Sequence, residues 1–229
     1  MQGLTAQGIP WLVFDWKRAG YRDLLATHHN VRVFTVGRDI SPFSFNPLIP
    51  PPRVELIAWF KQFIQCISHA YFLGHGCEVI FQDVLGKDTK TLFDVLKKLH
   101  TYPANWRKLQ WLQSAERAVK ALCYGTIIHV LNVEHTPPIH HWLNQNLVFE
   151  LDALTESEAK FFVEILMSAI YFYKRENQHR ALHVSVIEEA HHLLQKENWN
   201  VEAKSVMDKI FREIREYGEA LVVIDQMPS

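Results

Sequence analysis

The chain has little net charge and no long hydrophobic segment, and each absence excludes a class of protein. Its 24 basic and 25 acidic residues give a formal net charge of −1 at pH 7. The composition therefore offers no overall attraction for nucleic acid, although a single loop or pore can still be basic. The longest apolar helix that we expect, around residues 161–173, is too short to span a bilayer. No secretory signal peptide is visible.

Cysteine is scarce as well. The three cysteines, Cys66, Cys77 and Cys123, have neither the spacing of metal ligands nor that of a disulfide framework. We interpret them as reduced thiols in the core of a cytoplasmic protein. With 229 residues, 48% of them hydrophobic and 21% charged, the chain has the composition of one large globular domain, or of one domain with an inserted subdomain.

Five short apolar runs predict the buried strands of a parallel sheet. They lack the alternation of half-exposed strands, and helical patterns separate the later ones, which favours an α/β fold with helices on both faces of the sheet. The predicted strands cover residues 11–15, 31–36, 147–151, 182–188 and 220–225. We also expect a helix over residues 159–174 after a capping box at 155–158, and another over 201–217 that ends at Gly218.

Residues 54–122 have a different pattern, in which apolar residues recur at three- and four-residue spacing. This spacing predicts helices packed away from the sheet. It divides the chain into an α/β core, made of residues 1–53 and 123–229, and a helical insertion, made of residues 54–122. Thr91 and Asp94 predict the cap of one of these helices.

Part of the insertion combines aromatic with basic residues, a mixture that also occurs in nucleic-acid-binding surfaces. We predict that its large apolar residues belong to the core, and that its basic residues form a solvated face. The apolar set is Trp106, Leu109, Trp111 and Leu112, and the basic set is Lys97, Lys98, Arg107 and Lys108.

Polar residues stand where three of the predicted strands end. Asp15, the pair Glu188 and Glu189, and Gln226 occupy these positions. Because the carboxyl ends of parallel strands share one edge of a sheet, we expect these side chains to cluster. Adjacent acids can hold a hydrated Mg²⁺ and polarise a water molecule, as nucleotide hydrolysis requires. The alternative is that both glutamates merely begin a solvated helix, where acidic residues are favourable.

Two arginines precede the last predicted strand. Arg212 and Arg215 lie on the helix that we expect over residues 201–217. A guanidinium group is suited to the charge and geometry of phosphate. They are therefore further candidates for a nucleotide site.

The 13 histidines, and the Glu-Glu-Ala-His-His run at residues 188–192, raise a second hypothesis, that of a metal-dependent hydrolase. A helical zinc site uses His-Glu-x-x-His or its inverse, and neither pattern occurs in the sequence. We therefore expect the histidine pairs to be surface residues or residues with satisfied hydrogen bonds. The pairs are His28-His29, His140-His141 and His191-His192.

Four segments in order along the chain carry a resemblance to a known family. They are residues 9–17, 46–48, 186–191 and 214–229, and the most specific parts are Glu-Glu-Ala-His at 188–191 and Tyr-Gly at 217–218 followed by Gln-Met-Pro-Ser at 226–229. The chain resembles the HerA/FtsK superfamily, the hexameric DNA-pumping ATPases that include HerA-type helicases and the ATPases of conjugation and type IV secretion. The resemblance implies a RecA-like, mostly parallel sheet with flanking helices and a helical insertion.

The resemblance also implies roles for the matching residues. Glu188 would be the Walker B acid, which holds Mg²⁺ through water. Glu189 would orient and deprotonate the attacking water. Gln226 would be the sensor of the γ-phosphate. Arg215, or failing it Arg212, would be the arginine finger that reaches the nucleotide of a neighbouring subunit.

Asp15 and Lys17 match a segment that lies near the nucleotide in this family. The implied cofactors are ATP and Mg²⁺, and the implied activity is ATP hydrolysis coupled to movement on double-stranded DNA. The implied partners are DNA, further copies of the chain in a homo-hexamer, and a nuclease.

One motif of the family is missing from this sequence. No Gly-x-x-x-x-Gly-Lys-Ser/Thr loop, which cradles the phosphates, occurs in the chain. In the family this loop lies one helix before the strand that corresponds to residues 11–15. We therefore expect an internal piece of a longer ATPase, which binds ATP poorly or not at all by itself. The alternative is an inactive ATPase-like protein with a structural role.

Overall fold

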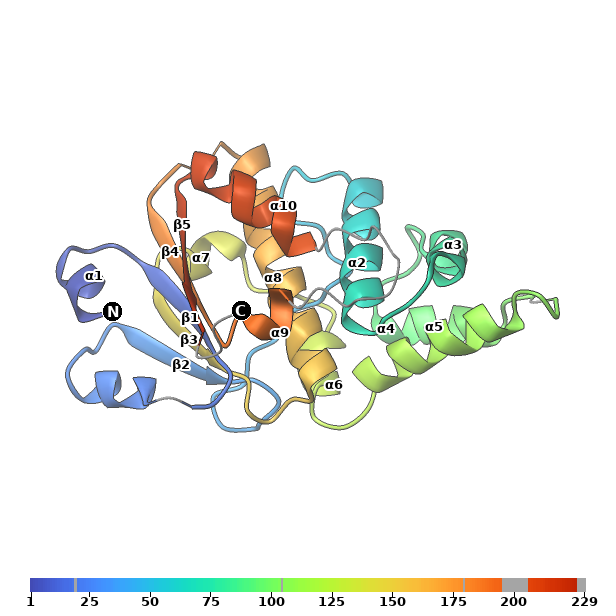
Figure 1. The fold of residues 1–229 in the computed structure, drawn as a ribbon, viewed down its shortest axis with the longest axis horizontal. Helices are drawn as coiled ribbons and strands as arrows, with labels where there is room; N and C mark the ends of the chain where they lie inside the picture. The colour runs from blue at the N-terminus through green and yellow to red at the C-terminus, as the bar shows by residue number, and fades with distance from the viewer. Residues whose placement is uncertain (19, 104, 179, 195–205, 226–229) are drawn as a thin grey trace.

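The computed structural model describes residues 1–18, 20–103, 105–178, 180–194 and 206–225. Within these residues the protein has an α/β fold around a parallel sheet of five strands (Figure 1). The strands are β1 (Trp11–Asp15), β2 (Val31–Thr35), β3 (Asn146–Glu150), β4 (His183–Glu188) and β5 (Glu219–Ile224), in the order β2-β3-β1-β4-β5. Each prediction of a strand is confirmed to within one residue at either end.

The central strands are buried on both faces, which explains why their sequences show no alternation. Every residue of β1 and of β3 is buried. On one face, Phe14, Phe149 and Phe162 form an aromatic cluster under α8 (Glu156–Glu176), with ring centroids 5.6–6.5 Å apart. On the other face, Trp11 and its valine neighbours pack against residues of α1 (Gln2–Ala6) and η1 (Tyr21–Ala26).

Helix α8 begins with the predicted capping box. The Thr155 hydroxyl accepts a hydrogen bond from the Glu158 amide, and the Glu158 carboxylate accepts one from the Thr155 amide at 2.8 Å. This box satisfies two backbone amides that have no partner inside the helix. The helix consequently starts directly after Thr155, three residues before the position expected from its apolar pattern.

The described residues of the segment 54–122 form helices joined by turns and loops, and they form no strand. The segment contains α2 (Leu56–Ala70), α3 (His75–Val84), α4 (Leu92–His100) and α5 (Leu109–Leu122), and α4 begins with a Thr91–Asp94 capping box. Helix α2 packs on α8 through buried aromatic pairs such as Phe63–Phe161. Helices α3, α4 and α5 lie beyond α2, away from the sheet (Figure 1).

One prediction about this segment is wrong. Trp106, Leu109 and Trp111 were expected in the core, but 78%, 46% and 45% of their surface is exposed. Only Leu112 of that set is buried. Helix α5 turns the stripe Leu112, Ala115, Ala118, Val119 and Leu122 inward, and this buried stripe begins only at Leu112. Trp106 precedes the helix, and Leu109 and Trp111 lie in its first turn.

The remaining helices connect the strands. They are α6 (Ile128–Leu131), α7 (Ile139–Trp142), α9 (His191–Leu194), α10 (Val206–Glu213) and η2 (Ile214–Tyr217). The predicted helix over 201–217 thus ends in a 3₁₀ turn, and its residues 201–205 lie outside the described residues. It ends at Gly218 as predicted, with φ of +76°. A Cβ atom there would lie 2.4 Å from the Arg180 carbonyl oxygen, so only glycine fits. None of the described helices is long and apolar enough to cross a membrane.

A buried ion pair fixes the start of β5. Lys174, near the end of α8, places its Nζ 2.9 Å from Glu219 Oε2, and neither side chain is exposed. The Lys174 ammonium also donates to the carbonyl oxygens of Ala181 and Gly218. Burial alone would raise the pKa of Glu219, but the hydrogen bond and charge of His183, with the charge of Lys174, lower it below its ordinary value.

This pair generates a stability prediction. Lys174→Met leaves the buried Glu219 carboxylate without its ammonium partner, and breaking a buried pair on one side typically costs ~3–5 kcal/mol. Equilibrium unfolding in urea should show a loss of this size. Lys97→Met, which removes an exposed lysine on α4, is the control and should change the free energy of unfolding by less than about 0.5 kcal/mol. Equal stability of the two variants would contradict the importance of the pair.

Candidate functional site

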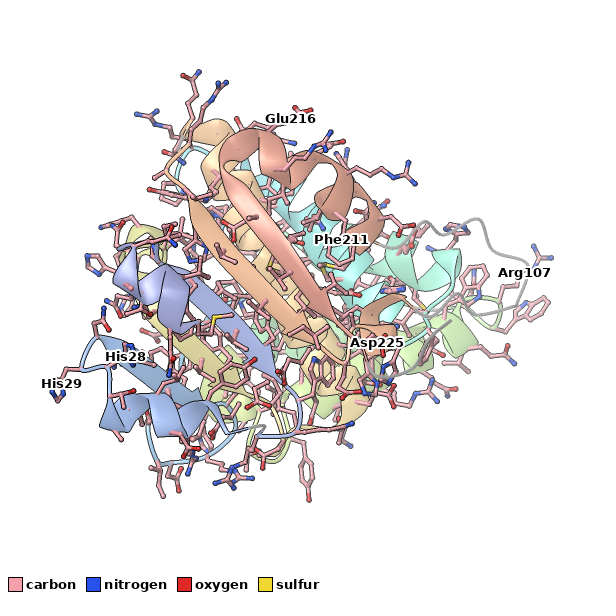
Figure 2. The ribbon with its side chains drawn as sticks, turned by 60° about the vertical axis from the view of Figure 1, so that its left-hand side comes forward. His28, His29, Arg107, Phe211, Glu216 and Asp225 are labelled. Atoms are coloured by element: carbon pink, nitrogen blue, oxygen red, sulfur yellow. The ribbon has the colours of Figure 1, made fainter. Side chains whose placement is uncertain are left out.

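The carboxyl edge of the sheet brings four of the predicted site residues together, Asp15, Lys17, Glu188 and Glu189. Asp15 ends β1 and Glu188 ends β4, and these strands are adjacent, with Phe14 paired to Ile187. Glu189 follows directly. Gln226 lies outside the described residues, but Asp225, the residue before it, follows the end of β5 at this same edge (Figure 2).

Asp15 is fully buried at the centre of this edge. Its Oδ1 atom accepts a hydrogen bond from the Lys17 amide at 3.1 Å, which turns the chain sharply after β1. Its backbone carbonyl accepts one from the Leu151 amide at 2.9 Å. One carboxylate oxygen and the backbone carbonyl of Asp15 therefore each accept a hydrogen bond from a backbone amide, and the charge of Asp15 acts on Glu188.

Glu188 is half-buried and shares this charged environment. Burial raises its pKa above the ordinary value of 4.5, and the charges of Asp15 and Glu189 raise it further, although a hydrogen bond from Tyr21 acts in the opposite direction. The Tyr21 hydroxyl donates to Glu188 Oε1 at 2.6 Å. Burial and the adjacent carboxylate raise the pKa of Tyr21 as well, so the phenol remains a donor. Sequence reasoning gave Tyr21 no role, because neither its spacing nor its type signals one.

Glu189 is only 6% exposed, and its backbone is in the left-handed region with φ of +47°. Residues other than glycine rarely adopt this conformation, and it typically costs ~1–3 kcal/mol. Two contacts hold it: Lys17 Nζ lies 2.8 Å from Glu189 Oε1, and the Ala190 amide donates to the Ile224 carbonyl. A strained turn with two external restraints is typical of a functional position.

The two histidines that follow have separate environments. His191 Nδ1 lies 3.1 Å from Asp225 Oδ1 and 3.7 Å from Glu189 Oε2, and ligand atoms of all three residues lie within 4.8 Å of one another. His192 instead stacks on Trp16 at 4.7 Å and contacts Glu156. Both have the satisfied contacts that we expected. Asp225 was not predicted as a site residue, although its place at a strand end is a signal that could have found it.

Several carboxylates gather at this edge of the sheet. Asp15, Glu188, Glu189 and Asp225 each supply one, and Lys17 Nζ lies 2.8 Å from Glu189 Oε1. Carboxylate oxygens are the ligands that Mg²⁺ prefers, so this group can hold a cation. The donor set therefore fits the Mg²⁺ that the resemblance implies.

The carboxylates that follow the neighbouring strand β3 are paired with arginines. Glu150, at the end of β3, is 2% exposed, and the guanidinium of Arg22 binds both of its oxygens at 2.6 Å. Asp152 forms ion pairs with Arg18 and Arg38. These carboxylates have arginine partners, so they have no need of a metal ion.

Arg212 and Arg215 do not join the acidic residues. Both are exposed, on α10 and η2, which lead to the beginning of β5. Figure 2 shows the neighbouring Glu216 at one end of β5 and Asp225 at the other. Within one chain, the two arginines therefore lie at the opposite edge of the sheet from Glu188 and Glu189.

Similarity to known proteins is found in structure rather than in sequence. No family model matches the chain, and no curated protein does. VirB4 of Thermoanaerobacter pseudethanolicus aligns with 96% of this chain at a TM-score of 0.65 and 16% identity. The bacterial conjugative coupling protein TrwB aligns with 98% at 0.66 and 9% identity, and TrwB in complex with ADP and Mg²⁺ aligns with 96% at 0.56 and 11% identity.

The match covers most of this chain but less of the known structures. The chain spans 63% of the VirB4 chain and 57% and 64% of the two TrwB chains. The sheet order, the flanking helices and the likeness to these proteins agree with the architecture that the sequence resemblance implied. The chain thus shares the RecA-like fold of VirB4 and TrwB.

Proposed function

We propose that this chain is part of an ATPase that couples ATP hydrolysis to movement on double-stranded DNA. The observation that carries the proposal is the pair Glu188 and Glu189 at the carboxyl edge of a RecA-like sheet, next to the buried carboxylate of Asp15. Nucleotide hydrolysis needs a metal-binding acid and a group that positions water, and these two residues can supply both. TrwB has been seen with ADP and Mg²⁺ and with a GTP analogue.

In this proposal the two glutamates have different tasks. Glu188 holds Mg²⁺ through water, and the cation would lower the pKa of this carboxyl, which burial and the charges of Asp15 and Glu189 raise. Glu189 accepts the proton of the attacking water. Lys17 holds one oxygen of Glu189 and leaves Oε2 on the side of His191. Gln226 reads the γ-phosphate, and Asp15 holds the turn that presents Lys17.

The arginine finger acts between subunits in this proposal. Arg215 is exposed and lies at the edge of the sheet opposite to the acids of its own chain. In a ring of identical subunits, here a hexamer, such an arginine faces a neighbour's nucleotide rather than its own. Arg212 is the second candidate, and a nuclease is a further partner.

The free edge of β5 supports the proposal that the phosphate-binding loop belongs to another segment of a longer protein. Among the described strands, β5 pairs only with β4. Val222, Val223 and Ile224 are 41%, 44% and 40% exposed, although parallel strands are normally covered on both faces. An apolar, unpaired edge favours pairing with a further strand. We propose that the strand that carries the loop pairs here.

Two other functions remain. An inactive ATPase-like protein with a structural role would keep the fold but need no base at Glu189. A metal-dependent hydrolase has one observation in its favour, the grouping of Glu189, His191 and Asp225. Metal analysis of the purified protein tests the hydrolase hypothesis. A metal-dependent hydrolase should retain zinc, and its His191→Ala variant should not.

The first prediction concerns a version of the protein that includes the phosphate-binding loop. Glu189→Gln should keep nucleotide binding and abolish turnover, since the amide keeps the shape but accepts no proton, and a positioned base is worth ~10²–10⁴-fold. Glu188→Gln should instead weaken Mg²⁺-dependent nucleotide binding. Residues 1–229 alone should show no hydrolysis. If residues 1–229 hydrolyse ATP and Glu189→Gln abolishes that activity, the phosphate-binding loop is not required. The assignment of Glu189 as the base would then still hold.

The second prediction can be made on the present chain. The pKa of Glu188 is raised above 4.5 on folding, so the folded state binds its proton more tightly, and the stability from this group falls as the pH rises from 4.5 through the raised pKa. Glu188→Gln should therefore be more stable than the natural chain at about pH 8 and nearly equal to it at about pH 4. Mg²⁺ should stabilise the natural chain more than the variant in thermal unfolding. If the difference in stability between Glu188→Gln and the natural chain increases at acid pH, the raised pKa of Glu188 is contradicted.

The third prediction concerns Arg215 in the same longer protein. Arg215→Ala should leave nucleotide binding unchanged and lower turnover by ~10³–10⁵-fold in the assembled ring, because a finger in trans stabilises the transition state of a neighbour. Arg212→Ala is the matched control, an exposed arginine one helical turn away. If Arg212→Ala has the larger effect, the roles of the two arginines are reversed. If neither lowers turnover, the finger is elsewhere.

A further inference from the structure

We propose that the hairpin tip, defined as residues 101–103 and 105–111 at the junction of α4 with α5, is a binding surface for single-stranded nucleic acid. Trp106 would be its stacking platform, and Arg107 would contact phosphate. This inference goes beyond the ATPase proposal and does not rest on it, because it depends on a surface far from the carboxyl edge of the sheet.

The first observation is the exposure of large aromatic side chains. Trp106 is 78% exposed, whereas Trp11 and Trp59 are fully buried in the same protein. An indole that remains in solvent does little for folding, since its large apolar surface stabilises the protein only when it is buried. Figure 2 shows the adjacent Arg107 projecting from the end of the molecule opposite His28 and His29, where no other labelled residue lies near it.

The second observation is that aromatic rings and cations alternate at this tip. The Arg107 guanidinium lies 5.1 Å from the centre of the Trp106 ring, and the Lys108 ammonium lies 5.4 Å from that of Tyr102. Surfaces for single strands combine stacking rings with cations that follow the backbone. An arginine stacked on an indole can turn to a phosphate while a base takes its place on the ring.

The third observation is a local excess of positive charge in a nearly neutral chain. Residues 97–120 contain six basic residues and one acidic residue, a net charge of +5, so the rest of the chain, with −1 in total, carries −6. Asp88 pairs with Lys98, and Asp83 lies 3.9 Å from Lys108. In the part of the chain that the structure describes, the remaining basic residues have no ion-pair partner. They are Lys97, Arg107, Arg117 and Lys120.

The tip is held in position by α3. A Cβ atom on Gly76 would lie 2.1 Å from the ring of Trp111, so this glycine allows the indole to lie directly on the helix backbone. The Cys77 thiol also donates to the Trp111 carbonyl at 3.4 Å. The start of α5 is thereby fixed on α3. A helix start that is fixed in this way loses little freedom when a ligand binds to the adjacent residues.

The chemistry favours a single strand over two other partners. The bases of a duplex are stacked on one another, so an indole cannot reach their faces without opening the helix. An acidic peptide would satisfy the cations but has no ring to stack on Trp106. Unpaired bases joined by phosphates satisfy both features.

The test is fluorescence anisotropy of a labelled oligothymidylate of ~8 nucleotides with the 229-residue chain at low ionic strength. We expect binding that Trp106→Ala weakens about tenfold, the size typical of one base stacked on an aromatic ring. Arg107→Ala should weaken binding. It should also make the slope of the logarithm of the binding constant against the logarithm of the salt concentration shallower by about 0.7, the value for one phosphate on a single strand. Both residues are exposed, so their variants should fold.

Tyr124→Ala is the matched control, because Tyr124 is 79% exposed and lies beyond the other end of α5. It should leave the affinity unchanged. Absence of binding, an equal loss in Tyr124→Ala, or tighter binding of a duplex of the same length would each overturn the proposal. Equal competition by polyglutamate would assign the surface to an acidic protein instead and would also overturn it.

Discussion

The pairing of β1 with β4 is the constraint on which the candidate site depends. Their register, in which Phe14 lies opposite Ile187, places Asp15 beside Glu188 although the two are far apart in the sequence. Both strands are buried, so a slip by one residue would expose their apolar side chains and is strongly disfavoured. The hydrophobic core therefore determines where the charges lie, and the strain at Glu189 is stored in a turn that the core supports.

The contrast between neighbouring carboxylates shows how one edge can serve two purposes. Arginines neutralise Glu150 and Asp152, which stabilises the end of β3. At the end of β4, burial raises the pKa of Glu188, and the charges of Asp15 and Glu189 raise it further. A carboxyl group whose pKa is raised in this way is typical of a functional site, whereas carboxylates paired with arginine are typical of a structural ion-pair network.

The strands and the meeting of Asp15 with Glu188 could be predicted because they follow from local apolar patterns and from one rule of parallel sheets. Other features required the coordinates. Tyr21 reaches Glu188 through a short 3₁₀ helix with no pattern of its own. Trp106 was expected in the core because aromatic residues usually are buried. It lies in the turn before α5, and only the coordinates show that its side chain is exposed there. The partner of Lys174 depends on a contact between distant segments.

Strand β5 is bound to a different neighbouring element at each end. The buried Lys174–Glu219 pair secures its first residue to α8, next to the turn that carries Arg215, and the Ala190 amide secures its last residue to the turn that carries Glu189. Six residues of strand span roughly 20 Å. A single strand therefore joins the surface around Arg215 to the acidic edge, and each of its ends is bound to a different neighbouring element.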